Sequence, residues 1–192
     1  MTGLSSHPDA DAFDLKMMSL ALEEARKCEP KPTAFSVGCV LVAKPPNTLP
    51  TVIARGFSRE LEGNTHAEAN ALAKVRRMSA DAKRQLLSAS SSAPDGDELS
   101  TDSLLRTVDV YTTMEPCSVR TSGLAPCADA LIEAGVARCI IGVAEPDDFV
   151  NCEGARKLKD AGIEVVWLKG MEQHCLEVAR KWHSSTEKST SI

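Results

Sequence analysis

Residues 107–135 read TVDVYTTMEPCSVRTSGLAPCADALIEAG, and this stretch indicates the class of fold. The β-branched and aromatic side chains over 107–113 predict a strand, and residues 128–134 predict a helix that ends at Gly135. The loop between them carries two cysteines, and Cys127 is expected to open the helix. A strand, a loop and a helix in this order form one unit of a parallel sheet.

The flanking sequence supplies the other elements of an α/β fold. Thr65 is the expected N-cap of a helix that begins at His66, because its hydroxyl can accept from the free amides of the first turn. Hydrophobic periodicity predicts a mixed five-stranded sheet between helical layers, which is a three-layer α/β/α sandwich. The elements expected outside the central stretch are helices at 12–28, 66–78 and 153–161, a C-terminal helix, an antiparallel pair of strands at 36–43 and 51–57, and strands at 139–144 and 163–167.

The composition changes between the helix predicted at 66–78 and the strand predicted at 107–113. Residues 79–103 are rich in Ser, Ala, Asp and Gly, so we expect a flexible insertion there. Residues 184–192 are expected to form a disordered tail. A total of 192 residues is the size of one ordinary domain with an insertion, so we expect a single domain over 1–183.

Charge and cysteine content limit the expected partners and location. The formal net charge is −5, which argues against a nucleic-acid partner, and a small molecule is expected instead. No apolar run approaches the roughly 20 residues of a membrane span, so no membrane partner is expected. Seven cysteines without the spacing of a disulfide scaffold favour a reducing compartment. We expect the cytoplasm, with the nucleus as the alternative.

Two short motifs contain three potential zinc ligands and one potential proton carrier. Residues 66–68 read His-Ala-Glu, and two Pro-Cys pairs end at Cys117 and Cys127. We predict that His66, Cys117 and Cys127 bind one Zn²⁺ per chain, because three protein ligands leave the fourth tetrahedral position for water, as in catalytic sites. Glu68 lies in the first turn of the same predicted helix, where it can exchange protons with that water.

These parts predict hydrolytic deamination. Zinc lowers the pKa of water towards about 7, so that hydroxide can attack a ring carbon carrying an exocyclic amine. Glu68 is the predicted catalytic residue that moves the protons. The order H-x-E followed by P-C-x-x-C is typical of zinc-dependent nucleobase deaminases. In this chain nine residues, not two, separate the cysteines.

The motifs resemble the cytidine-deaminase-like superfamily and, within it, the pyrimidine deaminases of riboflavin biosynthesis. In the riboflavin enzymes a long loop ending in Pro-Cys separates the two cysteines, as here, whereas cytidine and transfer-RNA adenosine deaminases have two residues between them. The stretches that carry the resemblance are VGCVLV at 37–42, HAEANAL at 66–72, TMEPCS at 113–118 with PCADALIEAGV at 126–136, and AGIEV at 161–165.

The resemblance implies a phosphorylated pyrimidine substrate. The family acts on a 2,5-diamino-6-(ribosyl- or ribitylamino)pyrimidinone 5'-phosphate, which loses its C2 amine. The chain looks like a fungal-type enzyme that is not fused to a reductase, which favours the ribitylamino substrate. The resemblance also implies a homodimer.

Nine residues are candidates for substrate contact. Arg120, Thr121 and Ser122 lie in the cysteine loop, where an arginine can bind phosphate bidentately and hydroxyls can donate. Where the bacterial relatives have Pro-Asn-Pro this chain has Ala34-Phe35-Ser36, so an asparagine contact is missing. The other six candidates are Ser36, Glu115, Ser118, Glu145, Asp147 and Asn151.

Three other functions remain open from the sequence alone. The chain could deaminate another base or nucleoside, such as cytidine, deoxycytidylate, guanine or transfer-RNA adenosine. It could be a non-catalytic subunit with a deaminase fold, although such a subunit can lose the acid-base residue and Glu68 is present. It could also be a structural zinc module. Among the remaining cysteines, Cys39, Cys139 and Cys175 are expected to be buried in the core.

Overall fold

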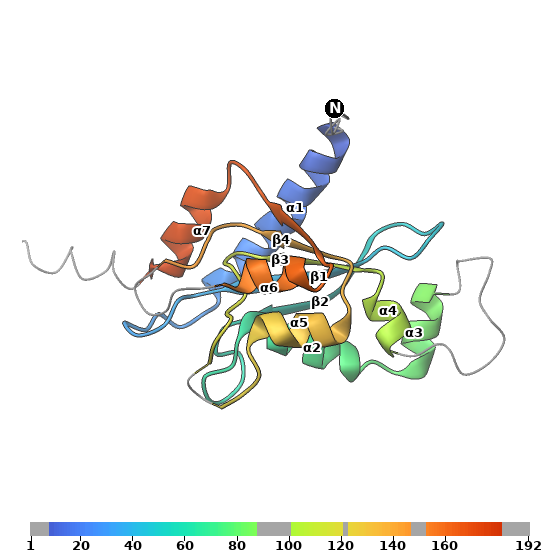
Figure 1. Cartoon of the computed structure of the whole chain (residues 1–192), viewed down its shortest axis with the longest axis horizontal. Helices are drawn as coiled ribbons and strands as arrows, with labels where there is room; N and C mark the ends of the chain where they lie inside the picture. The colour runs from blue at the N-terminus through green and yellow to red at the C-terminus, as the bar shows by residue number, and fades with distance from the viewer. Residues whose placement is uncertain (1–7, 88–100, 121–122, 147–152, 182–192) are drawn as a thin grey trace, which may run out of the picture.

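A computed structural model describes residues 8–87, 101–120, 123–146 and 153–181 (Figure 1). The tail predicted at 184–192 and the centre of the predicted insertion, 88–100, lie outside these ranges. The same is true of four candidate contacts, Thr121, Ser122, Asp147 and Asn151.

Five strands form one mixed sheet in the order β2-β1-β3-β4-β5. β1 pairs antiparallel with both β2 and β3, whereas β3, β4 and β5 are parallel to one another. The mixed five-stranded sheet expected from the sequence is therefore confirmed. The strands are β1 (Gly38–Ala43), β2 (Thr51–Phe57), β3 (Val108–Thr112), β4 (Arg138–Ile141) and β5 (Glu164–Trp167).

Helices cover both faces of this sheet and bury two separate cores (Figure 1). α1 (Pro8–Arg26) and α7 (Glu172–Ala179) lie on one face, and α2 (Ala67–Arg76), α5 (Cys127–Ala134) and α6 (Gly154–Asp160) lie on the other. Every residue of β1 is buried, because successive side chains alternate between the two cores. The three-layer α/β/α sandwich is confirmed.

The three cysteines expected in the core are buried. Cys39 and Cys139 belong to the core beneath α2 and α5, and Cys175 belongs to the core beneath α1 and α7. Among the described residues, no helix combines the length and apolar character needed to cross a bilayer.

Two helices occur where the sequence predicted an insertion without regular structure. α3 (Ala80–Leu87) and α4 (Thr101–Leu105) flank the undescribed residues 88–100. Leu104 and Leu105 are buried in the core beneath α2, and Lys83 Nζ of α3 donates to Thr101 Oγ1 at 2.6 Å. The leucines anchor α4 although the surrounding composition is polar, which explains why composition alone missed this helix.

The predicted N-cap of α2 was wrong by one residue. The N-cap is His66, with extended backbone dihedrals, and α2 begins at Ala67. Thr65 does not cap the helix, because its hydroxyl accepts from Asn70 Nδ2 at 3.1 Å and interacts with the backbone of Leu61. Asn70 also donates to Phe57 O at 2.8 Å, so it fastens the loop before α2 to the end of β2.

Candidate active site

His66, Cys117 and Cys127 converge at one end of the sheet. His66 precedes α2, Cys117 lies in the loop after β3, and Cys127 is the first residue of α5. Their potential ligand atoms all lie within 4.8 Å of one another. Two helix N-termini therefore point at the same place, which favours negative charge there.

The spacing of these atoms suits zinc. His66 Nδ1 lies 3.5 Å from both Cys117 Sγ and Cys127 Sγ. Tetrahedral zinc, with bonds of about 2.3 Å to sulfur and about 2.0 Å to nitrogen, requires an N···S separation of about 3.5 Å. One imidazole and two thiol groups are also the donor set that zinc prefers, so the residues fit the ion.

The protein already stabilises a thiolate at this position. The Cys127 backbone N–H donates to Cys117 Sγ at 3.3 Å, and the Ala128 N–H donates to Cys117 O at 3.1 Å. Hydrogen bonds from the Cys127 side chain and from His66 lower the pKa of Cys117 to about 4. The hydrogen bond to Cys117, together with burial, raises the pKa of Cys127. The pair therefore retains a proton that zinc binding would displace.

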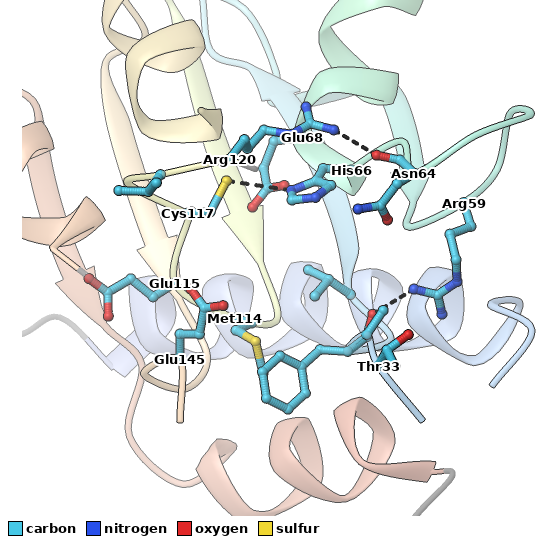
Figure 2. A pocket seen from close by; sticks show the side chains of 14 residues that line it. Thr33, Arg59, Asn64, His66, Glu68, Met114, Glu115, Cys117, Arg120 and Glu145 are labelled. Carbon is cyan, nitrogen blue, oxygen red and sulfur yellow. Dashed lines mark hydrogen bonds between the residues drawn. The ribbon is translucent and has the colours of Figure 1, made fainter. Parts of the chain in front are cut away.

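Glu68 is buried beside this cluster. Its side chain faces the cleft in the first turn of α2 and points toward His66 (Figure 2). Thr112 Oγ1 lies 3.0 Å from Glu68 Oε1. Burial and the neighbouring Cys117 sulfur raise the pKa of Glu68. Glu68 can therefore hold and release a proton without being one of the three clustered ligands.

A cleft opens in front of the cluster, and its far wall comes from the segment before β1 (Figure 2). Arg59 shapes this wall by donating to Phe35 O at 3.0 Å and Glu29 O at 2.9 Å. Arg59 adopts a left-handed backbone conformation, with φ of 63°, which is uncommon for a residue other than glycine. The other residues of this wall are Thr33, Ala34 and Val37.

The predicted substrate contacts occupy different places. Arg120, Glu115 and Glu145 line the cleft, whereas Ser36 and Ser118 do not. Ser36 is buried near the Arg59 guanidinium, with a separation of 3.4 Å.

Ser118 and Glu115 have a structural task that the sequence did not indicate. Ser118 Oγ accepts from Glu153 N at 3.1 Å, and Glu115 Oε1 accepts from Ala155 N at 2.8 Å. Both bonds fasten the cysteine loop to the start of α6. Because only one Glu115 oxygen is used in this bond, its place on the cleft wall is compatible with substrate contact.

Arg120 connects the two loops at the cleft mouth. Its Nη2 donates to Asn64 O at 2.6 Å (Figure 2), and its Nη1 lies 3.5 Å from Ala125 O. Arg120 thereby holds the cysteine loop against the loop that leads to His66.

Several residues of the cleft were absent from the sequence prediction. They have no motif spacing of their own. The residues missed are Thr33, Ala34, Phe35, Val37, Arg59, Asn64, Met114 and Val119.

Known proteins match both the sequence and the fold. Residues 11–143 match the family described as the cytidine and deoxycytidylate deaminase zinc-binding region. The chain is 37% identical over 166 residues to the diaminohydroxyphosphoribosylamino-pyrimidine deaminase of Schizosaccharomyces pombe, covering 86% of this chain and 35% of that protein. It is 29% identical over 157 residues to the riboflavin biosynthesis protein RibD of Aquifex aeolicus, covering 80% of this chain and 34% of that protein. The chain thus spans about a third of the length of these relatives.

A solved structure resembles almost the whole chain. The Aspergillus oryzae Rib2 deaminase in complex with DARIPP is 30% identical, with a TM-score of 0.67, covering 91% of this chain and 94% of that one. The family match covers more than half of the sequence, and the histidine and both cysteines of the predicted zinc site come together in the fold. The chain therefore belongs to the zinc-binding cytidine and deoxycytidylate deaminase family.

Proposed function

We propose that this chain hydrolyses the C2 amine of 2,5-diamino-6-ribitylamino-4(3H)-pyrimidinone 5'-phosphate, which releases ammonia, as a step of riboflavin biosynthesis. The ribosylamino compound is the alternative substrate. The observation that carries the proposal is the buried Glu68 carboxyl, facing the cleft beside the cluster of His66, Cys117 and Cys127.

We assign zinc to that cluster and proton transfer to Glu68. Zinc held by one imidazole and two thiolates supplies the Lewis acidity that makes water a nucleophile near neutral pH. Glu68 accepts a proton from the attacking water and delivers it to the ring nitrogen, and it then assists protonation of the departing amine. The water oxygen bonds to C2, the C2–N bond breaks and ammonia leaves, so no oxidant or reductant is required.

The charged groups in the cleft suit a substrate that carries amino groups as well as a phosphate. Arg59 and Arg120 supply positive charge, and guanidinium groups suit phosphate oxygens. Glu115 and Glu145 lie across the cleft from Arg59, where carboxylates can accept from amino groups (Figure 2). The relatives agree with this choice, because the Aspergillus oryzae enzyme has been solved with DARIPP, a phosphorylated pyrimidine.

Ammonia release tests the proposal directly. Zinc-loaded protein is offered the ribitylamino pyrimidinone phosphate, the ribosylamino compound, cytidine and deoxycytidylate in separate reactions. We expect turnover of the diaminopyrimidinone phosphates, with the ribitylamino compound preferred. Turnover of cytidine compounds alone would preserve the chemistry and overturn the substrate. Failure with all four compounds, with zinc bound, would favour either an untested base as substrate or a non-catalytic subunit.

We also propose that the chain forms a homodimer through the surface around the cleft mouth. Leu61, Val119 and Leu124 are large apolar residues with 47%, 57% and 57% of their surfaces exposed. They lie on the two loops that Arg120 joins, and exposed apolar groups of this kind favour an interface. Light scattering should give twice the monomer mass, and Leu124→Ser should shift it towards the monomer. A monomeric wild-type protein would contradict this proposal.

We propose a cytoplasmic location, with the nucleus as the alternative. None of the six described cysteines forms a disulfide, which suits a reducing compartment. Microscopy of a fluorescent fusion protein tests this location. Fluorescence in the secretory pathway or outside the cell would contradict it.

A further inference from the structure

The last residue of β3, Thr112, is completely buried between the sheet and the helices that carry the active site. Val108 and Val110 of the same strand belong to the core beneath α2 and α5. Because side chains alternate along a strand, Thr112 faces this layer too. It is therefore a polar group in an apolar layer, and its hydroxyl needs a partner there.

That hydroxyl has two partners, and one is the carboxyl of Glu68. Thr112 Oγ1 lies 3.0 Å from Glu68 Oε1 and 3.0 Å from Met114 O. A hydroxyl carries one hydrogen and two lone pairs, so it can donate to only one of these acceptors at full strength. It donates to Glu68 when the carboxylate needs a donor. It can instead donate to Met114 O and accept from Glu68 when the carboxyl carries the proton.

We propose that Thr112 is a positioning residue that holds Oε1 of Glu68 and thereby aims the other carboxylate oxygen at the reacting groups. This inference rests on the proposed function of Glu68. The glutamate side chain has three rotatable bonds, and the Cys127 side chain is a second hydrogen-bond partner that helps to locate it.

The backbone of the active-site loop shares this anchor. Met114 O, the second partner of the hydroxyl, belongs to the segment that leads from β3 to Cys117. Met114 also lines the cleft. Thr112 therefore contacts both the proton carrier on α2 and the loop that presents a zinc ligand. These two segments are far apart in the sequence.

The test compares Thr112→Val, which keeps the shape and removes the hydroxyl, with Thr112→Ser, which keeps the hydroxyl. For Thr112→Val we expect kcat to fall about tenfold, with KM changed by less than about twofold and zinc content unchanged, because a hydrogen bond to a charged group is lost at the reacting centre. Thr112→Ser should stay within about threefold of wild-type kcat.

Thr113→Val is the matched control. Thr113 is buried one residue further along, and its Oγ1 accepts from Gly38 N at 3.1 Å, but it does not line the cleft. Its loss should reduce stability while kcat stays within about twofold of wild type. An equal fall in kcat for the two valine variants would assign Thr112 a structural role only.

A fourth variant keeps the outcome decisive. In a Glu68→Gln background, Thr112→Val should cause no further loss of kcat, because the two residues act as a unit. Full kcat in Thr112→Val, or an independent additional loss in the double variant, would overturn the inference.

If the wild-type protein releases no ammonia from any of the four compounds, the proposed function fails instead. If Thr112→Val does not fold, Thr112→Ser provides the test. Loss of kcat in folded, zinc-loaded Thr112→Ser would overturn the inference about Thr112.

Discussion

At the scale of single residues, the site depends on groups whose environments differ although they are neighbours. Glu68 is buried, and its pKa is raised by that burial, whereas hydrogen bonds lower the pKa of Cys117 to about 4. Raised proton affinity suits a group that must carry a proton, and thiolate character suits a zinc ligand. Proton transfer and zinc binding are thus assigned to different residues of one site.

Glu68→Gln should separate proton transfer from zinc binding. The amide keeps the shape of the side chain but cannot shuttle the proton, so we expect turnover to fall at least about 10²-fold. Zinc content and the unfolding midpoint should stay close to wild type. Glu23→Gln, at an exposed position on α1, is the control and should retain full turnover. Wild-type turnover in Glu68→Gln would remove the assignment of Glu68 as the proton carrier.

Cys117→Ala should abolish stable zinc binding. Two ligands remain, and the negative charge that two thiolates contribute is halved, so zinc per chain should fall from about one to near none after gel filtration. Cys175→Ala removes a buried thiol from the opposite core and should keep its zinc. Elemental analysis of both proteins measures the difference. Retention of zinc by Cys117→Ala would show that the ligand set is different.

At the scale of elements, the site is located by how closely α2 approaches the sheet. Gly56 of β2 lies directly beneath the first turns of α2. A Cβ at Gly56 would lie 2.4 Å from Ala67 O and 2.8 Å from Ala71 N. The absence of a side chain there allows the helix that carries Glu68 to pack against β2.

Gly56→Ala should displace α2 and impair the site. Because the clash is with backbone atoms, we expect a loss of about 1–3 kcal/mol in unfolding free energy and weaker zinc binding. Gly38→Ala is the matched control, since its Cβ would lie 2.0 Å from Ala21 O of α1, in the other layer. It should lose stability while the folded fraction keeps its zinc affinity. Denaturation and zinc titration of both proteins distinguish them, and equal zinc affinities would contradict the prediction.

At the scale of the whole molecule, the two helical layers are fastened to the sheet in different ways. The layer of α2 and α5 packs on an apolar core, whereas the layer of α1 adds a buried polar link. Tyr111 Oη donates to Asp14 Oδ1 at 2.6 Å, and Arg138 forms ion pairs with Asp14 and Asp109. This network joins α1 to β3 and β4 at the face away from the active site.

Tyr111 should make the protein sensitive to alkali. Burial, followed by the hydrogen bond to Asp14, raises the pKa of Tyr111 above its usual value. A raised pKa in the folded state stabilises the fold fully below the unfolded pKa of about 10, and this contribution is lost as pH rises above it. Tyr111→Phe should therefore cost about 1–2 kcal/mol near pH 8 and weaken the decline above about pH 10. Urea unfolding at several pH values tests this, and an equally steep decline in Tyr111→Phe would contradict it.

The sequence by itself determined the class of fold and the chemical core of the site. Apolar and β-branched runs predicted the five strands, and hydrophobic periodicity predicted the helices other than α3 and α4, because these patterns and the turn residues beside them act locally. The His-Ala-Glu triplet and the two Pro-Cys pairs identified the clustered residues, since zinc accepts few donor types and two of the motifs lie at helix N-termini.

Only the tertiary structure decided the cleft and the partners of Glu68. Arg59 and Phe35 come from separate segments whose distance depends on how β1 and β2 pair, and no local pattern encodes it. Thr112 lies far from Glu68 in sequence and contacts it only when α2 packs on the sheet. The helices α3 and α4 likewise depend on leucines buried by the rest of the fold. Motifs encode donor chemistry locally, whereas substrate shape and carboxylate orientation arise from long-range packing.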